Sequence, residues 1–271
     1  MALMAILLIV GYLIGGRGGV TLAFIMALIM NFGSYWFSDR IVLAMYHARE
    51  IKENDNPRFF GIVRSASQMA GLPMPKIYIV PSPGANAFAT GRNPAHAAVA
   101  ATEGILGLLD DDELTAVMAH ELGHVRNRDT LIGAMAATIA GAISYIAFMA
   151  HWIPFFGSDD DDSRGNIIVI LLIAILAPIA AALVQMAISR RREFMADRAS
   201  AEISHKSMAL ASALGKLSMQ SKKIPLKTSP ASAHLFIVNP LVKKDISSLF
   251  STHPAVEERI ERLREYAREG L

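Results

Sequence analysis

Hydrophobic residues are gathered into four long runs in this chain of 271 residues. The runs cover residues 1–14, 20–37, 131–156 and 167–188, and no Lys, Arg, Asp or Glu interrupts them. A helix needs about 20 apolar residues to cross the hydrocarbon core of a bilayer, and the last three runs approach that length. The pattern therefore predicts a mainly α integral membrane protein with about four transmembrane helices.

The first run is the shortest, and it has two interpretations. It resembles the apolar core of a secretory signal, but no Lys or Arg precedes it, and glycine-rich residues 15–19 replace a small-residue cleavage site. We interpret the run as the first helix of a tight hairpin that turns at these glycines. It crosses the bilayer fully only if Met1 lies near the interface.

Helical and extended segments alternate outside the four runs. Polar residues 38–52 predict that the second helix continues beyond the membrane, and residues 58–70 predict another helix that ends near Gly71. Residues 76–80, 86–91 and 97–102 are predicted strands, which together predict a small antiparallel sheet. Acidic residues 110–113 predict a helix start, because carboxylates stabilise the positive end of a helix dipole. We expect helix from residue 190 to about residue 220, loop over residues 222–242 and a charged helix over residues 254–268.

The positions of the charged residues orient the chain, whereas its net charge of +2 gives no indication of nucleic-acid binding. Arginines and lysines follow the second run, precede the third and follow the fourth, and four consecutive aspartates occupy residues 159–162 between the third and fourth. By the positive-inside rule, residues 38–130 and the segment from residue 190 are cytoplasmic. The aspartates form either a solvated hairpin tip or a cation-binding segment.

A pair of histidines lies in the helix predicted to begin near residue 110. His120 and His124 are four residues apart and share one helix face, with Glu121 between them. Two imidazoles at this spacing can bind one Zn²⁺ while the glutamate faces a reacting water molecule. The alternative is an ordinary solvated helix face. Because the chain has no cysteine, a zinc site must use nitrogen and oxygen ligands.

Glu193 and Asp197 form a second pair with helical spacing, 193 − 124 = 69 residues beyond His124. The third and fourth spans form a hairpin that returns the chain to the same side, so Glu193 can lie near the histidine pair. Three ligands and an open fourth position are the catalytic zinc pattern. Asp197 would then accept a hydrogen bond from a ligating imidazole. The alternative is a juxtamembrane cluster in which Glu193 pairs with the neighbouring arginines.

This arrangement predicts a hydrolase that needs no protein nucleophile. Glu121 would accept a proton from the attacking water and pass it to the leaving amine. One Zn²⁺ per chain would lower the pKa of that water.

These residues resemble the HtpX-type membrane zinc endopeptidases, bacterial relatives of the CAAX prenyl proteases. The resemblance is carried by residues 120–124 with Asp129, by residues 192–197, by residues 86–91 and by residues 251–254, in family order. It implies a zincin-like (gluzincin) protease domain on the cytoplasmic side of the bacterial inner membrane. It also implies cleavage of damaged membrane proteins in envelope quality control and stress response.

Three further features have both structural and functional interpretations. One is the segment of Asn86, Ala87, Phe88 and Ala89. It is either a sheet strand alone or an edge that pairs with an extended substrate. His253 is either a helix N-cap before Pro254 or a donor that steadies the oxyanion. Asp129 is either a partner of nearby arginines or an organiser of the zinc helix.

The sequence therefore predicts four segments. They are a transmembrane hairpin (1–37), a cytoplasmic catalytic part with the histidine pair (38–130), a second hairpin (131–189) and a cytoplasmic part with the third ligand (190–271). The predicted function is a membrane-embedded zinc endopeptidase whose partners are the lipid bilayer and polypeptide substrates. A site-specific processing protease would share every residue, and the oligomeric state is not predicted. A four-span scaffold or transporter would require polar residues inside the spans, where few occur.

Overall fold

The computed structural model describes residues 2–129, 131–132, 186, 188–224, 237 and 254–271. The chain divides into two compact units, one of Met1–Ser34 with Ile132–Ile188 and one of Tyr35–Leu131 with Ser189–Leu271. Nearly all of the two later hydrophobic runs, most of the predicted loop at residues 222–242, and His253 lie outside the described residues.

Helix α1 (Ala2–Trp36) consists of two helical arms joined by a break at Gly15 and Gly16. Gly16 has a φ of 55°, in the left-handed region that glycine adopts without steric cost. The arms approach closely, because a Cβ on Gly11 would lie 2.6 Å from the carbonyl oxygen of Gly19. The turn predicted at the glycines is thus confirmed. The residues buried between the arms are Leu8, Val20, Ala23 and Ala27.

No helix among the described residues combines the length and hydropathy that a membrane crossing requires. The helical hairpin at the N-terminus is present, but its two predicted spans are not confirmed. They stay predictions, as do the spans at residues 131–156 and 167–188.

The chain after α1 does not form the continuous helix that was predicted up to residue 52. Helix α2 (Ser38–Met45) ends early, and His47 follows with a φ of 52°, outside the helical region. Strand β1 (Arg49–Glu50) then pairs antiparallel with β2 (Lys76–Val80). Local polarity could not reveal this pairing, because the partner strand lies more than 25 residues further along the chain.

Helix α3 (Pro57–Met69) agrees with its prediction at both ends. The Asn56 side chain accepts a hydrogen bond from the Phe59 N–H, and Pro57 occupies the first turn, where its missing N–H has no consequence. Gly71 follows the helix with a φ of 65°. Both boundaries therefore arise from residues visible in the sequence.

The strands form one sheet in the order β1-β2-β4-β3. Strand β3 (Ala87–Thr90) is antiparallel to β4 (Ala98–Thr102), but β4 is parallel to β2. The predicted antiparallel sheet was therefore wrong, because the chain leaves β2, forms β3 at the sheet edge and returns between them as β4. All five residues of β4 are buried, as its central position requires.

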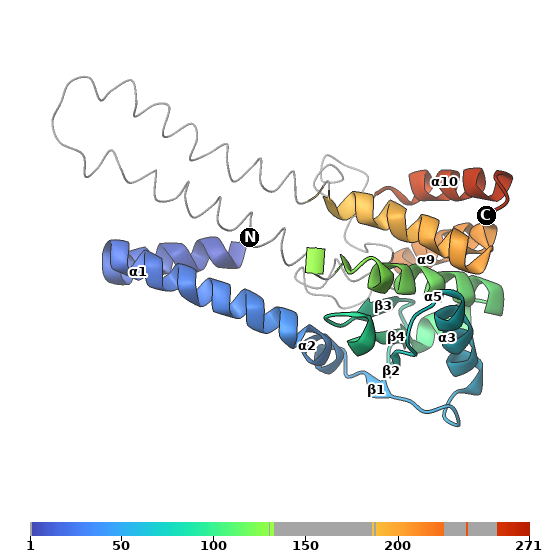
Figure 1. Ribbon diagram of the computed structural model, residues 1–271, viewed down its shortest axis with the longest axis horizontal. Coiled ribbons are helices and arrows are strands. Elements are labelled where there is room, and N and C mark those ends of the chain that lie inside the picture. Colours follow the sequence, from blue (N-terminus) through green and yellow to red (C-terminus); the bar gives the residue numbers. More distant parts are fainter. Residues whose placement is uncertain (1, 130, 133–185, 187, 225–236, 238–253) are drawn as a thin grey trace, which may run out of the picture. The chain divides into compact units, whose positions relative to one another are not determined.

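Helices cover both faces of this sheet (Figure 1). Val99 and Ala101 point to a core shared with α3, α5 (Asp111–Arg126), α9 (Ser207–Lys223) and α10 (Val256–Arg268). Ala98 and Ala100 point to the other face, where they pack with Leu43 of α2. The short elements η1 (Pro94–His96) and α4 (Glu103–Leu108) flank β4. A further helix covers residues 188–204.

Helix α5 begins where the acidic run predicted. The Asp110 side chain accepts from the Glu113 N–H, and the Glu113 side chain accepts from the Asp110 N–H, which is a capping box. Glu113 is buried and also binds Lys216 of α9 at 2.6 Å. The start of α5 is thereby fixed both locally and against α9.

Candidate metal centre

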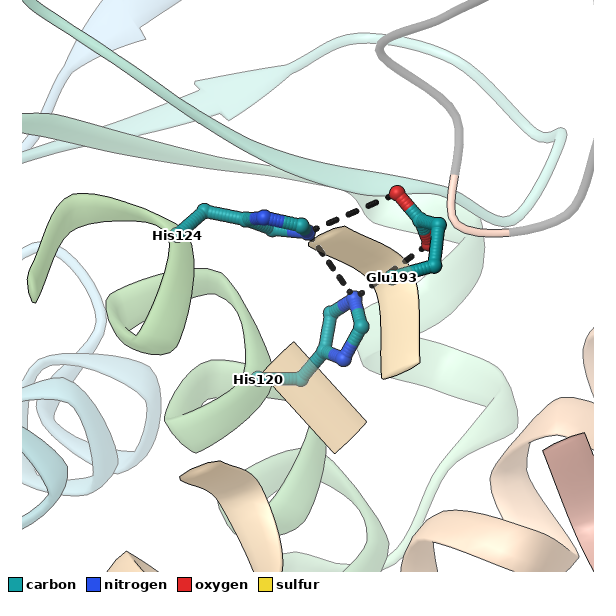
Figure 2. Close-up of side chains that lie close together, drawn as sticks. All are labelled: His120, His124 and Glu193. Atoms are coloured by element: carbon teal, nitrogen blue, oxygen red, sulfur yellow. Dashed lines mark hydrogen bonds and ion pairs between the residues drawn. The ribbon is translucent and has the colours of Figure 1, made fainter. Parts of the chain in front are cut away.

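The side chains of His120, His124 and Glu193 converge on one point (Figure 2). Helix α5 supplies the imidazoles, whose Nε2 atoms lie 3.2 Å apart. The Glu193 carboxylate comes from the helix of residues 188–204 and lies 3.8 Å from His120 Nε2 and 3.7 Å from His124 Nε2. All three donors lie within 4.8 Å of one another, a spacing suited to one divalent cation between them.

Gly123 allows these two helices to approach. A Cβ on Gly123 would lie 2.9 Å from the Ala199 Cβ and 3.4 Å from the Ala196 Cα. Nearby, the Ser200 hydroxyl donates to the Ala116 carbonyl at 2.7 Å. Gly123 therefore lets α5 lie close to the helix that carries Glu193, which helps to bring Glu193 to the imidazoles. No sequence pattern had pointed to this role of Gly123.

Each imidazole has a carboxylate at its other nitrogen. His120 Nδ1 lies 3.0 Å from Asp197 Oδ1, and His124 Nδ1 lies 2.5 Å from Asp129 Oδ2. A carboxylate at Nδ1 favours the tautomer that leaves Nε2 available to a metal. The structure thus places Asp197 against the candidate ligand His120, and it places Asp129 against the candidate ligand His124.

Burial and neighbouring charges shift the protonation of these groups. Burial lowers the pKa of His124, but Asp129, Glu193 and Glu121 together outweigh burial and raise it to about 9. Burial raises the pKa of the Glu121 carboxyl above its usual value, and the adjacent imidazoles offset this only in part. The carboxylates that raise the pKa of His124 would also attract a divalent cation. Such a cation competes with the proton for the imidazole nitrogen. The donor set therefore fits a bound metal ion.

A buried arginine, which no sequence pattern had singled out, lies against two of the three candidate ligands and against Asp197. Arg259 of α10 has 0% relative exposure, and its Nε and Nη2 donate to the Asp197 carboxylate at 2.8 and 2.7 Å. Its Nη1 donates to the Ile237 carbonyl at 2.8 Å and lies 3.1 Å from Glu193 Oε2. Burial would lower the pKa of Arg259, but these two carboxylates raise it, so the guanidinium stays charged. The sequence did contain one indication of this burial. Arg259 lies four residues before Leu263, so the two share a helix face, and that face of α10 is buried.

Glu121 lies beside β3, the edge strand among the described residues, where its Oε2 accepts a hydrogen bond from the Ala89 N–H at 2.7 Å. The Thr102 N–H donates to the Asn86 carbonyl, so alternate residues of this segment bond to β4. The peptide groups of Ala87 and Ala89 therefore face away from β4.

The other predicted substrate residues are placed differently. Phe88 packs under α2, with its ring centroid 5.6 Å from that of Tyr46, and the buried Asn86 side chain accepts from the Ile237 N–H at 3.4 Å. Only Ala87 and Ala89 of the four thus offer edge peptide groups to a partner. His253 lies outside the described residues, so its predicted oxyanion role stays a prediction.

Comparisons with known proteins agree over nearly the whole chain. The protein-family model described as "Peptidase family M48" matches residues 53–267. The Protease HtpX homolog of Desulfatibacillum aliphaticivorans is 56% identical over 265 residues, which cover 97% of this chain and 86% of that protein. The Protease HtpX homolog of Paraburkholderia phytofirmans is 54% identical over 273 residues, which cover 99% and 95%.

A solved structure shares the fold. The crystal structure of S. mikatae Ste24p matches with a TM-score of 0.61 and 16% sequence identity, over 97% of this chain and 62% of that one. The chain thus spans less than two thirds of the length of Ste24p. At this identity the likeness concerns the fold alone.

Proposed function

Because this chain belongs to peptidase family M48, we propose that it is a membrane-bound zinc endopeptidase that cleaves polypeptides at the cytoplasmic side of the bilayer. The family makes it a metallopeptidase, and among the described residues His120, His124 and Glu193 form a group that could hold the metal. Zinc is the proposed ion, since two imidazoles, one carboxylate and an open position are its catalytic pattern. The observation that carries the proposal is the position of Glu121, beside the imidazoles and bonded to the edge strand.

The substrate is proposed to bind as an added strand along β3. An edge strand pairs with an extended peptide through main-chain hydrogen bonds. The Ala87 N–H and carbonyl and the Ala89 carbonyl face away from β4, whereas the Ala89 N–H is bonded to Glu121. A peptide paired here would run directly past the carboxylate of Glu121.

Glu121 is the proposed general base. It would accept the proton of the attacking water and then donate that proton to the leaving amine, two steps that a carboxyl with a raised pKa serves better than an ordinary one. The Ala89 N–H holds one carboxylate oxygen and leaves the other for the water. When bound, Zn²⁺ supplies Lewis-acid polarisation of the scissile carbonyl and acidifies water.

The proposed substrates are damaged or misfolded membrane proteins. The charge-free hydrophobic runs, the arginines and lysines that flank them and the similarity to HtpX homologues support this location and substrate class. A profile of cleavage sites distinguishes it from a processing protease. A quality-control enzyme should cut many sites in an unfolded membrane protein, and a processing enzyme should cut one.

Replacing the base tests the activity. Glu121→Gln keeps the shape of the side chain but cannot accept a proton, so we expect the metal content to persist while peptide cleavage falls by about 10²–10⁴-fold. Glu103→Gln, at an exposed position on α4, is the matched control and should cleave normally. Near-normal cleavage of an unstructured peptide by the Glu121→Gln variant would exclude Glu121 as the base.

Metal analysis and thiol labelling test the remaining parts. We expect one zinc per chain in the wild type and a loss of zinc in His124→Ala. Since the chain has no cysteine, Met208→Cys, at a residue 54% exposed, and Ser158→Cys can be compared in intact cells with an impermeant thiol reagent. We expect labelling at residue 158 only. Labelling at residue 208 only would reverse the orientation.

A further inference from the structure

Helix α2 has apolar side chains on both of its faces. Its inner face contributes Leu43 and Val42 to the cluster that contains Phe88 of β3, and Tyr46, the residue that follows the helix, packs against the same cluster. Its outer face carries Ile41 and Met45, which are 48% and 49% exposed. A surface helix normally presents polar residues opposite its buried stripe, so the composition of the outer face calls for a partner.

The exposed apolar surface continues at the residues just before α2. Phe37 is 53% exposed and lies four residues before Ile41, so it extends the same stripe. Trp36 is 52% exposed. The outer apolar stripe, defined as Phe37, Ile41 and Met45, thus ends beside a tryptophan, the residue that favours the boundary between hydrocarbon and water.

Arginines flank this stripe. The Arg92 guanidinium carbon lies 4.9 Å from the centroid of the Trp36 ring, and Arg40 is exposed on α2 itself. Asp39 is on the half-buried side of α2. An apolar stripe bordered by tryptophan and arginine matches the layering of an anionic bilayer surface, where rings enter the acyl boundary and guanidinium groups meet the phosphates.

We propose that the outer apolar stripe of α2 lies in the surface of an anionic lipid bilayer, and that α2 thereby holds the substrate strand β3 at a set height above the lipid. The link to β3 is direct, because Leu43 of α2 belongs to the same buried cluster as Phe88, and the ring of Tyr46 at the end of α2 contacts the Phe88 ring. This inference rests on the proposed membrane location and adds a specific consequence. Peptide segments that emerge from the bilayer would reach the β3 edge before freely dissolved peptides do.

Tryptophan fluorescence tests this contact in the full chain. The two native tryptophans are first replaced, in a Trp36→Phe, Trp152→Phe background. Met45→Trp then places a probe on the stripe, and Met219→Trp places a control on α9, at a residue 60% exposed. Each protein is reconstituted in phosphatidylglycerol vesicles that carry spin labels near the headgroups. An interfacial helix is buried about 5–10 Å deep, so we expect shallow-labelled lipid to quench residue 45 and not residue 219.

Two results would overturn the inference. They are an unquenched probe at residue 45 and equal quenching at residues 45 and 219. An unquenched probe with blue-shifted emission would indicate that a protein surface covers the stripe. Sedimentation with the vesicles and cleavage of a soluble peptide are measured on the same samples. A chain that sediments and cleaves while residue 45 stays unquenched refutes this inference alone. A chain that does not sediment counts against the membrane location as well.

A paired activity assay shows what the contact does. Ile41→Asp with Met45→Asp should cleave a soluble peptide normally and lose activity severalfold on the same peptide anchored to vesicles by a lipid chain. Met219→Asp should lose neither activity. Equal activity of the double variant on both substrates, at wild-type level, would show that the stripe does not position the substrate strand at lipid.

Discussion

The two imidazoles of the candidate metal centre are held by carboxylates in different ways. The His120–Asp197 pair is 1% exposed at both side chains, and Arg259 from a third segment binds the same aspartate. The His124 side chain is 21% exposed, and its partner Asp129 follows five residues later in the same segment. We call the His120–Asp197 pair the His120 arm and the His124–Asp129 pair the His124 arm. The His120 arm thus joins three distant parts of the chain, whereas the His124 arm depends mainly on one turn.

From this difference we expect folding and metal binding to be coupled through His120 and Asp197. Asp197 and Glu193 can be buried only when a positive charge accompanies them, since an unpaired buried charge is strongly destabilising. Arg259 supplies that charge from α10 before any metal arrives. The His124 arm needs no such assembly, although the Arg192 guanidinium also donates to the Asp129 carbonyl.

Removing Arg259 should have the largest effect. Arg259→Leu leaves two buried carboxylates without their cation, and we expect a loss of about 3–5 kcal/mol in the free energy of unfolding. Metal content should fall as well, because Glu193 and Asp197 lose their common partner. Chemical unfolding in detergent and metal analysis measure the two effects.

Two variants calibrate this result. Arg259→Lys keeps the charge but loses the two-pronged contact with Asp197, so it should fold with intermediate stability. Arg262→Leu removes a half-buried arginine of the same helix, whose partners are Glu258 and the Phe194 ring. It should cost less than about 1 kcal/mol. Equal stability of the Arg259→Leu and Arg262→Leu variants would refute the special role of the buried arm.

Changing Asp197 should weaken metal binding next most strongly. Asp197→Asn preserves the shape but lowers the basicity of His120, so we expect about 10–100-fold weaker zinc affinity with the fold retained. Zinc titration against a competing chelator measures it. Complete loss of metal from this variant, with metal retained in Glu193→Ala, would mean that Asp197 is the ligand and Glu193 is not.

Asp129→Asn should weaken zinc affinity less than Asp197→Asn does, by about tenfold. His124 is partly exposed, so water can replace part of the lost contact at its Nδ1. The same chelator titration ranks the two aspartate variants. If Asp129→Asn binds zinc more weakly than Asp197→Asn, burial does not decide the strength of the two arms.

Features of this molecule that depend on neighbouring residues could be predicted from the sequence. The cap at Asp110, the ends of α3 and the extent of β2 depend on local side chains and backbone preferences. The direction of β4 against β2 could not, because it depends on the path of the whole chain.

Some residues of the candidate metal centre could likewise be predicted from the sequence, and others could not. The spacing of His120 and His124 predicted their shared face, and Glu193 followed from a hairpin topology. Arg259 looked like one of several arginines in a charged helix. Its burial is decided by Asp197, 62 residues earlier in the chain. The turn that brings Asp129 back to His124 was also hidden, because nothing in the sequence marks Arg128 as left-handed.

The smallest predicted effect concerns that turn. Arg128 is exposed and has a φ of 54°, a conformation that costs a side-chain-bearing residue about 1–2 kcal/mol relative to glycine. Glycine loses more backbone entropy on folding, about 0.5–1 kcal/mol, so Arg128→Gly should stabilise the protein by about 0.5–1 kcal/mol. Arg128→Val, branched at Cβ, should destabilise it. Urea unfolding in detergent should rank glycine above arginine and arginine above valine, with zinc affinity unchanged in the glycine variant. The opposite ranking would show that the His124 arm is not held by a strained local turn.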